Sequence, residues 1–166
     1  MTDKETTVLL PGSYDPPTLG HLSLIERAAR QYGRVLAVAF VNPNKTYLFT
    51  PEERVQMLSR MTAQLENVRT DFSEGLVIDY AKKHGATLLI KGYRNEADLA
   101  YEQTQADWNL ENGGIRTLLW PAEDGLAAVS STAARAALSV LPQGSITPEK
   151  TMLPARVDVS TRKRRM

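Results

Sequence analysis

Short apolar segments alternate along this chain with segments whose apolar residues recur every three or four positions. The strand-like segments are apolar or β-branched and lie at residues 7–10, 35–41, 67–72, 86–90 and 115–120. The helix-like segments begin near Thr18, Thr50, Leu76 and Asn95, and a last one runs from Ser130 or Ser131 to about Val140. This alternation predicts an α/β fold: a doubly wound, Rossmann-like parallel sheet of five strands with helices on both faces.

Several segments carry more specific structural signals. Every residue from 35 to 41 is apolar, which is typical of a strand covered on both faces. Thr50, Pro51 and Glu53 have the spacing of a capped helix start, and Gly85 marks a helix end. The expected apolar stripes are Leu19, Leu22, Ile25 and Ala29 in the first helix, Val55, Leu58, Met61 and Leu65 in the second, and Ala97, Tyr101, Thr104 and Trp108 in the fourth, with Tyr101 in the core.

The composition is that of a globular protein without stabilising cross-links. The chain has 166 residues, of which 42% are hydrophobic and 23% are charged, enough for one domain with its own core. Cysteine is absent and the two histidines are His21 and His84, so disulfides and cysteine nucleophiles are excluded and a structural zinc site is disfavoured. The start of the chain lacks the apolar core of a signal peptide, and no apolar run is long enough to span a membrane. We therefore expect a cytoplasmic protein with no membrane partner.

The charge is unevenly distributed. The net charge is +1, but residues 150–166 contain six basic residues and one acidic residue. The rest of the chain therefore carries a net negative charge. The expected folded part is thus not a basic nucleic-acid surface. After Leu141 the apolar periodicity is lost. We expect one folded domain over residues 1–141 and, over 142–166, a C-terminal arm and basic tail that are disordered in part.

The loop after the first predicted strand is the strongest candidate for a binding site. Ligands of doubly wound sheets bind at the carboxyl ends of the strands, and this strand leads into P-G-S-Y-D-P-P-T-L-G-H at residues 11–21. Gly12 and Ser13 let a ligand approach the backbone. Thr18 and His21 share one side of a helix's first turn, where free N–H groups suit an anion and an imidazole can donate to a phosphate oxygen. An isolated T-x-G-H is more often a plain turn, but its place directly after the strand favours phosphate binding.

Three later loops carry further groups that suit anions. Lys45 lies in N-P-N-K, Lys91 and Arg94 lie in K-G-Y-R, and Arg135 follows the hydroxyls of S-S-T at 130–132. Each has an ordinary explanation as a solvated cation or a helix cap, but together they favour a polyanionic ligand. The sequence pairs no nucleophile with a base, so covalent catalysis is disfavoured. The pattern indicates phosphoryl or nucleotidyl transfer, in which positioning and charge neutralisation carry most of the catalysis.

These motifs together resemble those of the nucleotidyltransferases that share T/H-x-G-H and a late S-S-T-x-x-R. Over roughly residues 8–140 the chain is most similar to the phosphopantetheine adenylyltransferases, whose motifs match P-G-S-Y-D-P-P-T-L-G-H, N-P-N-K, F-T-P-E-E-R and K-G-Y-R-N-E-A-D-L-A-Y-E. The resemblance implies transfer of AMP from ATP to 4′-phosphopantetheine by direct in-line displacement, giving dephospho-coenzyme A and pyrophosphate.

The resemblance also implies the roles of individual residues. Catalysis would rest on His21, Lys45 and Arg94. ATP would be contacted by Ser13, Tyr14, His21, Gly92, Tyr93, Arg94, Glu102, Ser130, Ser131 and Thr132. The acceptor would be contacted by Ser13, Lys45, Val77 and Lys91, the last of which stands where the family usually has arginine. The family uses Mg²⁺, expected on the ATP phosphates without protein ligands, and assembles as a hexamer.

Other functions remain open from the sequence. A nicotinate or nicotinamide mononucleotide adenylyltransferase is the main alternative: S-S-T-A-A-R leans toward it, whereas the K-G-Y-R-N and Y-E segments argue against it. A cytidylyltransferase is a weaker one. A non-catalytic nucleotide-binding domain is disfavoured because His21 and Lys45 are both present. RNA binding through residues 162–165 is disfavoured because a short basic end is more often a solvated tail.

Overall fold

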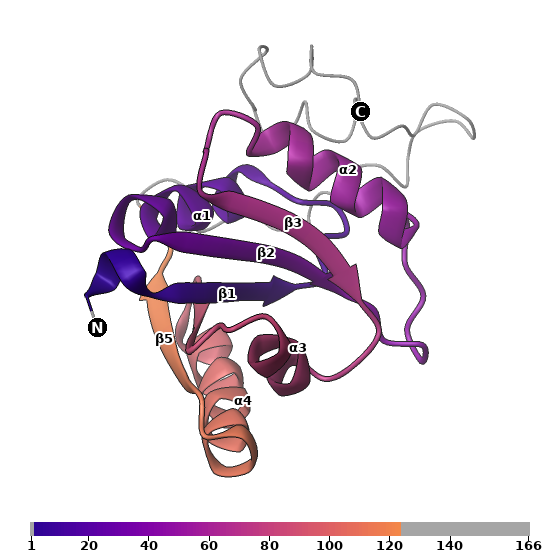
Figure 1. Ribbon diagram of the computed structural model, residues 1–166. Coiled ribbons are helices and arrows are strands. Elements are labelled where there is room, and N and C mark those ends of the chain that lie inside the picture. The colour runs from indigo at the N-terminus through magenta and orange to yellow at the C-terminus, as the bar shows by residue number, and fades with distance from the viewer. Residues whose placement is uncertain (1, 124–166) are drawn as a thin grey trace.

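The computed structural model describes residues 2–123, which form a five-stranded parallel sheet with helices on both faces (Figure 1). In chain order the elements are a 3-10 helix at Asp3–Glu5, β1 (Thr7–Gly12), α1 (Leu19–Gln31), β2 (Arg34–Phe40), α2 (Pro51–Met61), β3 (Val68–Ser73), α3 (Val77–Lys83), β4 (Leu88–Tyr93), α4 (Glu96–Gly113) and β5 (Arg116–Pro121). The predicted fold class is confirmed. The predicted helix at 130–140 and the arm and tail at 142–166 lie outside the described residues, so the domain boundary stays a prediction.

The order of the strands determines where a ligand can bind. The order across the sheet is β3-β2-β1-β4-β5, and every neighbouring pair is parallel. The chain builds outward from β1 to β3, then returns to place β4 beside β1 and continues outward to β5. The order therefore reverses between β1 and β4, and the carboxyl ends of these two strands flank the crevice where doubly wound sheets bind ligands.

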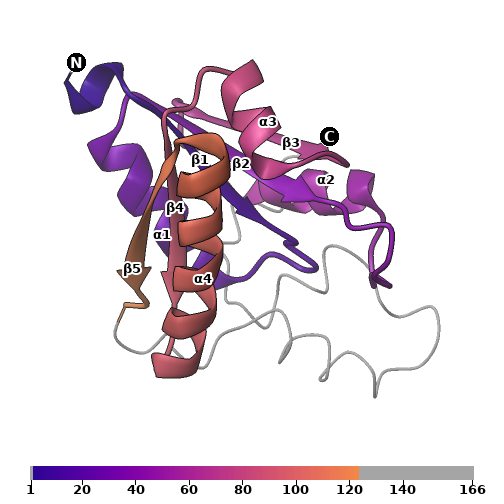
Figure 2. The same cartoon turned by 90° about the horizontal axis from the view of Figure 1, so that it is seen from below.

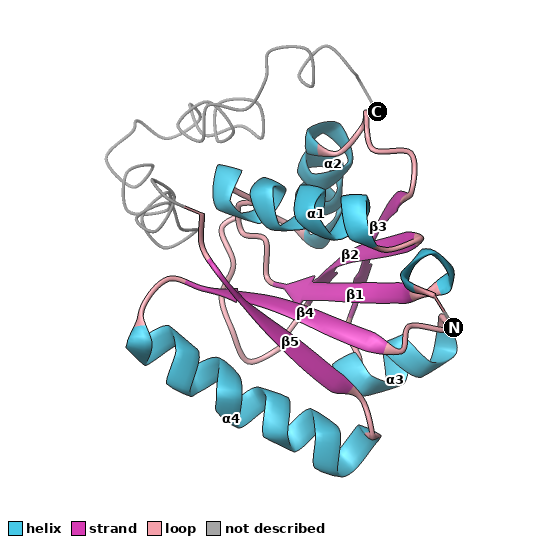
Figure 3. Cartoon of the chain, turned by 90° about the vertical axis from the view of Figure 1, so that its left-hand side faces the viewer, coloured by secondary structure: helices cyan, strands magenta, loops and turns pink. Residues whose placement is uncertain are grey.

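The core has two layers, one on each face of the sheet. Helices α1 and α2 cover one face, and α3 and α4 lie on the other (Figure 3). On β2, Val35, Ala37 and Ala39 pack in the first layer, whereas Leu36 and Val38 pack in the second. The strand is apolar at every position because both of its faces are covered, as its sequence predicts.

The predicted helix boundaries are confirmed by hydrogen bonds and backbone geometry. The Thr50 hydroxyl accepts from the N–H of Glu53 at 3.1 Å, and the Glu53 carboxylate accepts from the N–H of Thr50 at 2.9 Å. The Asn95 side chain caps α4 by accepting from the N–H of Asp98 at 2.9 Å. Gly85, just after α3, has a φ of 74°, a conformation that favours glycine.

The predicted core face of α4 is wrong. Tyr101 is 63% exposed and Trp108 is 47% exposed, whereas the buried residue of the helix is Ala106. Helix α4 lies along β4 and β5 (Figure 2). The small side chain of Ala106 on the buried side lets the helix approach these strands closely. Its large apolar side chains consequently lie outside the core.

The predicted stripe of α2 is correct only in part. Leu58 and Met61 are fully buried as expected, but Val55 is only half-buried and Leu65 lies beyond the end of the helix. Arg54, Met57 and Arg60 are buried as well. The helical period holds, but it turns two charged residues inward.

Within residues 2–123, no helix has the combination of length and apolarity needed to cross a lipid bilayer.

Removing a core side chain from α1 should destabilise the fold. Ile25 is fully buried between α1 and the sheet, so Ile25→Ala should lower the free energy of unfolding by about 2–5 kcal/mol through lost burial and the cavity left behind. Urea denaturation followed by circular dichroism measures this loss. Leu76→Ala is the control, because Leu76 is 53% exposed, and an equal loss in both variants would contradict the proposed core.

Candidate active site

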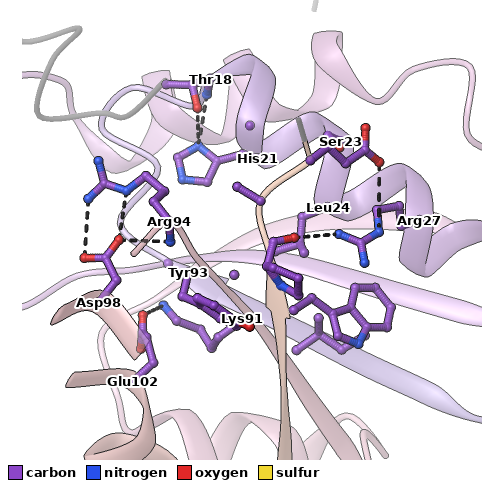
Figure 4. Close-up of a pocket in the computed structure, with 18 of the residues that line it drawn as sticks. Thr18, His21, Ser23, Leu24, Arg27, Lys91, Tyr93, Arg94, Asp98 and Glu102 are labelled. Carbon is purple, nitrogen blue, oxygen red and sulfur yellow. Dashed lines mark hydrogen bonds and ion pairs between the residues drawn. The ribbon is translucent and has the colours of Figure 1, made fainter. Parts of the chain in front are cut away.

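Two adjoining cavities open at the carboxyl ends of β1 and β4. The first cavity, of about 400 Å³, lies toward α1 and the start of α4 (Figure 4). The second cavity, of about 680 Å³, lies toward the loop after β2, the start of α3 and the middle of α4. Both are lined by Pro11, Gly12, Ser13, Lys91, Tyr101 and Glu102. Molecules in the two cavities would therefore meet over the end of β1.

Every predicted site residue among the described ones lines at least one of these cavities. The first cavity is lined by Ser13, Tyr14, His21, Lys91, Gly92, Tyr93, Arg94 and Glu102. The second is lined by Ser13, Lys45, Val77, Lys91 and Glu102. Ser130, Ser131 and Thr132 lie outside the described residues. The structure thus brings together side chains that are up to 89 positions apart in the sequence.

His21 is oriented by the start of its own helix. Thr18 immediately precedes α1, and its backbone N–H donates to Nδ1 of His21 at 2.9 Å (Figure 4). The imidazole thus takes the position of the acid in a capping box. Because Nδ1 accepts a hydrogen bond, the proton of the neutral ring lies on Nε2. The Tyr14 ring packs against the imidazole in an edge-to-face arrangement, with the ring centroids 4.8 Å apart.

The surroundings of His21 keep its ring neutral. Burial lowers its pKa to about 4, and the positive charges of Lys91 and Arg94 contribute in the same direction. At neutral pH the side chain is therefore a hydrogen-bond donor through Nε2 without a charge of its own.

Two cations of the first cavity are held in place by acids. Lys91, on β4, lies 3.4 Å from the Glu102 carboxylate and donates to the carbonyl oxygen of Pro11 at 3.3 Å. Arg94, between β4 and α4, pairs with Asp98 at 2.9 Å, and its backbone N–H donates to the same carboxylate at 3.2 Å (Figure 4). These contacts reduce the mobility of both cations.

Lys45 is a less constrained cation beside the second cavity. Its side chain is exposed and makes no hydrogen bond or ion pair with any residue from 2 to 123, although its backbone N–H donates to the carbonyl of Asn42 at 3.0 Å. Val77, the first residue of α3, lines the same cavity. An amine on an anchored backbone can follow a phosphate as a mobile point charge.

Tyr14 lies mainly below the site. Its ring is buried, its φ is 50°, and its hydroxyl donates to the carbonyl of Leu10 at 2.8 Å. Burial also raises the pKa of this phenol far above its usual value. The hydroxyl is thus used within β1, and the predicted ATP contact of Tyr14 stays a prediction.

Arg27 and Trp120 line the first cavity, although the sequence analysis did not select them. The Arg27 guanidinium lies over the Trp120 ring, 4.7 Å from its centroid, and donates to the carbonyl of Pro121 at 3.1 Å. Arg27 follows His21 and Leu24 at steps of three along α1, and that spacing was the available signal. These contacts make the end of β5 a wall of the cavity.

Asp15 and Arg54 are charged residues buried beside the loop after β2, which lines the second cavity. The sequence did not predict a role for either. Their exposed fractions are 1% and 0%. The period of α2 places Arg54 on the same face as Met57 and Leu58, but a charged residue is rarely expected on a buried face.

The arrangement can bind two anions side by side. It offers a neutral donor, two anchored cations and one mobile amine around the end of β1. Among residues 2–123, no group of three or more His, Asp or Glu side chains is placed to hold a metal ion. The groups present suit a reaction in which bound substrates supply both the attacking and the leaving atoms.

Two sequence comparisons show the family of this chain. The model of the cytidylyltransferase-like family matches residues 9–137. A curated phosphopantetheine adenylyltransferase of Corynebacterium efficiens is 43% identical over 123 residues, which cover 74% of this chain and 77% of that protein. The crystal structure of the lipopolysaccharide core biosynthesis protein from Thermoplasma volcanium GSS1 aligns with a TM-score of 0.49 and 18% identity, over 71% of this chain and 96% of that one. The family match and the 43% identity show that this chain belongs to the cytidylyltransferase-like family and, within it, to the phosphopantetheine adenylyltransferases.

Proposed function

We infer that this protein is a nucleotidyltransferase that moves AMP from ATP to 4′-phosphopantetheine, giving dephospho-coenzyme A and pyrophosphate in coenzyme A biosynthesis. The observation that carries this inference is the 43% identity to a phosphopantetheine adenylyltransferase across three quarters of the chain. The pair of adjoining cavities supports it, because such a reaction needs two anionic substrates in contact.

We propose that ATP binds in the first cavity and the acceptor in the second. The acceptor phosphate would lie near Ser13, where the two cavities meet, and its oxygen would attack the α-phosphorus of ATP in line with the departing pyrophosphate. Lys91 lines both cavities and would hold the acceptor phosphate. Val77 would contact the pantetheine arm. Holding both reactants in this geometry supplies much of the rate, because the attack becomes effectively unimolecular.

His21, Lys45 and Arg94 are the proposed catalytic groups. The Nε2–H of His21 would donate to an α-phosphate oxygen as negative charge grows there, and Lys45 would bridge that phosphate and the acceptor from the opposite cavity. Arg94 would hold the departing pyrophosphate. Tyr14, Gly92, Tyr93 and Glu102 are proposed to lie along ATP, and Ser130, Ser131 and Thr132 to hold its outer phosphates.

Mg²⁺ is proposed to reach the site on the ATP phosphates. Mg²⁺ is commonly bound by substrate phosphates, waters and few protein groups, and residues 2–123 provide no cluster of three ligands for it. When bound, the ion would neutralise charge on the transferred and departing phosphates. Its role is a proposal.

A homo-oligomer, a hexamer by family resemblance, is also proposed. Exposed apolar side chains of α4 away from the cavities support it, since Trp108 is 47% and Leu110 is 50% exposed and apolar surface of this kind marks contact sites. A cytoplasmic location is proposed as well.

Activity assays with different acceptors test the proposed reaction. Pyrophosphate release from ATP should occur with 4′-phosphopantetheine and not with nicotinate or nicotinamide mononucleotide. Product formed only with a mononucleotide would contradict the choice of acceptor. Product formed with CTP in place of ATP would contradict the choice of nucleotide.

Replacement of His21 tests its catalytic role. His21→Ala should lower kcat by at least about 100-fold with a much smaller change in KM, because the lost donor acts mainly in the transition state. The matched control is His84→Ala, since His84 stacks on Tyr80 at 3.9 Å outside both cavities and its loss should leave the kinetic constants near wild type. Unchanged constants in His21→Ala would show that the assignment is wrong.

The titration of His21 tests its neutral state. The pKa of His21 is lowered to about 4, so its NMR signals should move with a midpoint near pH 4, and the loss of one set of signals in His84→Ala assigns the other to His21. Between the unfolded value near 6.5 and the folded value near 4, the unfolded chain binds a proton that the folded chain does not. This group should therefore reduce stability as the pH falls through that window. A midpoint near 6.5 would contradict the neutral state of His21 at neutral pH and the effect of burial on its pKa.

A further inference from the structure

Arg54 joins the two loops that carry the proposed catalytic groups. It lies on α2, its side chain is fully buried, and its Nη1 donates to the carbonyl of Ser13 at 2.9 Å, in the loop after β1. The same guanidinium lies over the ring of Tyr47, 4.1 Å from the centroid, in the loop after β2. Its Nε donates to the carbonyl of Thr50 at 3.4 Å. One rigid planar group thus contacts the segment of Ser13 and the segment of Lys45.

Asp15 makes a second link between these loops. Its carboxylate is 1% exposed and accepts from the backbone N–H groups of Leu48 at 2.8 Å and Phe49 at 2.9 Å. Its negative charge also favours the charged form of Arg54, opposing the lowering of the arginine pKa by burial. The loop after β1 is therefore bound to the loop after β2 both by a carboxylate and through the guanidinium.

The backbone on both sides of Lys45 is held in place. The Tyr47 hydroxyl accepts from the N–H of Asn42 at 2.8 Å, so the segment from 42 to 47 is closed on itself, and its far end is held by Arg54 and Asp15. Lys45 lies inside this closed segment, and its side chain makes no hydrogen bond or ion pair with residues 2–123. The position of its amine is consequently set through the backbone.

Stability of the fold alone gives little reason for a buried arginine here. Burying a guanidinium is costly, and a well-packed apolar side chain often stabilises a core as well or better. The contacts that Arg54 makes lead instead to two loops of the site. The free-energy cost of burying Arg54 is therefore better explained by the fixed spacing of those two loops than by stability.

We propose that Arg54 is a positioning residue that, together with Asp15, sets the separation between the Ser13 backbone and the Lys45 amine. This proposal rests on the proposed adenylyl transfer, in which the two groups act on neighbouring phosphates. Arg54 touches neither cavity and acts through Tyr47 and Ser13.

The variant Arg54→Lys tests this role. Lysine keeps the charge but lacks the planar fork that stacks on Tyr47 while donating to Ser13. We expect kcat to fall by about 10- to 100-fold, the size expected for a displacement of about 1 Å, with little change in the KM for ATP. The control is Arg30→Lys, the same substitution on the exposed surface of α1, which should leave both constants unchanged.

A double-mutant cycle with Lys45 distinguishes positioning from a general structural effect. If Arg54 acts through Lys45, Arg54→Lys should cause little further loss of kcat in a Lys45→Ala protein. An equal fold-loss in both backgrounds, or a normal kcat in Arg54→Lys, would overturn the proposal. If Arg54→Lys does not fold, Asp15→Asn removes the charge of the second link without touching either cavity, and the same criteria apply to it.

Amide hydrogen exchange gives a readout that needs no activity. In the unliganded protein, Arg54→Lys should speed exchange at residues 42–49 while leaving β4 and α4 unchanged. Unchanged exchange at 42–49 would overturn the positioning role even if wild-type protein proved inactive with 4′-phosphopantetheine. A wild-type protein without that activity would contradict the proposed function, and the exchange experiment would still decide the role of Arg54.

Discussion

All five strands of the sheet run in the same direction, and the site depends on this constraint. Parallel strands place their carboxyl ends on one edge, so the loops after β1, β2 and β4 meet there although they come from distant parts of the sequence. The constraint requires helices on both faces, and the fully apolar sequence of β2 provides the covering surface for them. The same pattern that builds the core thus brings Ser13, Lys45 and Lys91 together.

In this site, lysine and arginine side chains carry the positive charge, whereas His21 is an uncharged hydrogen-bond donor. Cations surround the cavities, and the half-buried imidazole among them is kept neutral by its desolvation and by those cations. A neutral donor costs less to bury than a charged one, and it does not compete with Lys45 or Arg94 for the same counter-ion. Ion pairs with Glu102 and Asp98 hold Lys91 and Arg94 in place at the first cavity.

The sequence was sufficient for the parts of the structure that follow from local physics. The helix starts at Thr50 and Asn95 and the helix end at Gly85 depend on residues within one turn, and the strands depend on short apolar runs. The site loops follow from their position directly after strands. Tyr101 was placed wrongly because helical spacing gives the members of a face but not the direction in which that face points. Arg54 was missed because the partners that compensate its burial lie 41 residues away at Ser13 and across a loop at Tyr47. Such long-range compensation leaves no local pattern.

The hydrogen bond from Thr18 to His21 has a consequence for the empty enzyme. This hydrogen bond caps the first turn of α1 and also fixes the orientation of the His21 ring. The same contact therefore forms the start of the helix and orients the Nε2–H donor. Preorganisation of this kind means that no free energy is spent on turning the imidazole when a nucleotide arrives. Under the proposed catalytic role of His21, selection for folding of this turn and selection for catalysis act on the same two residues.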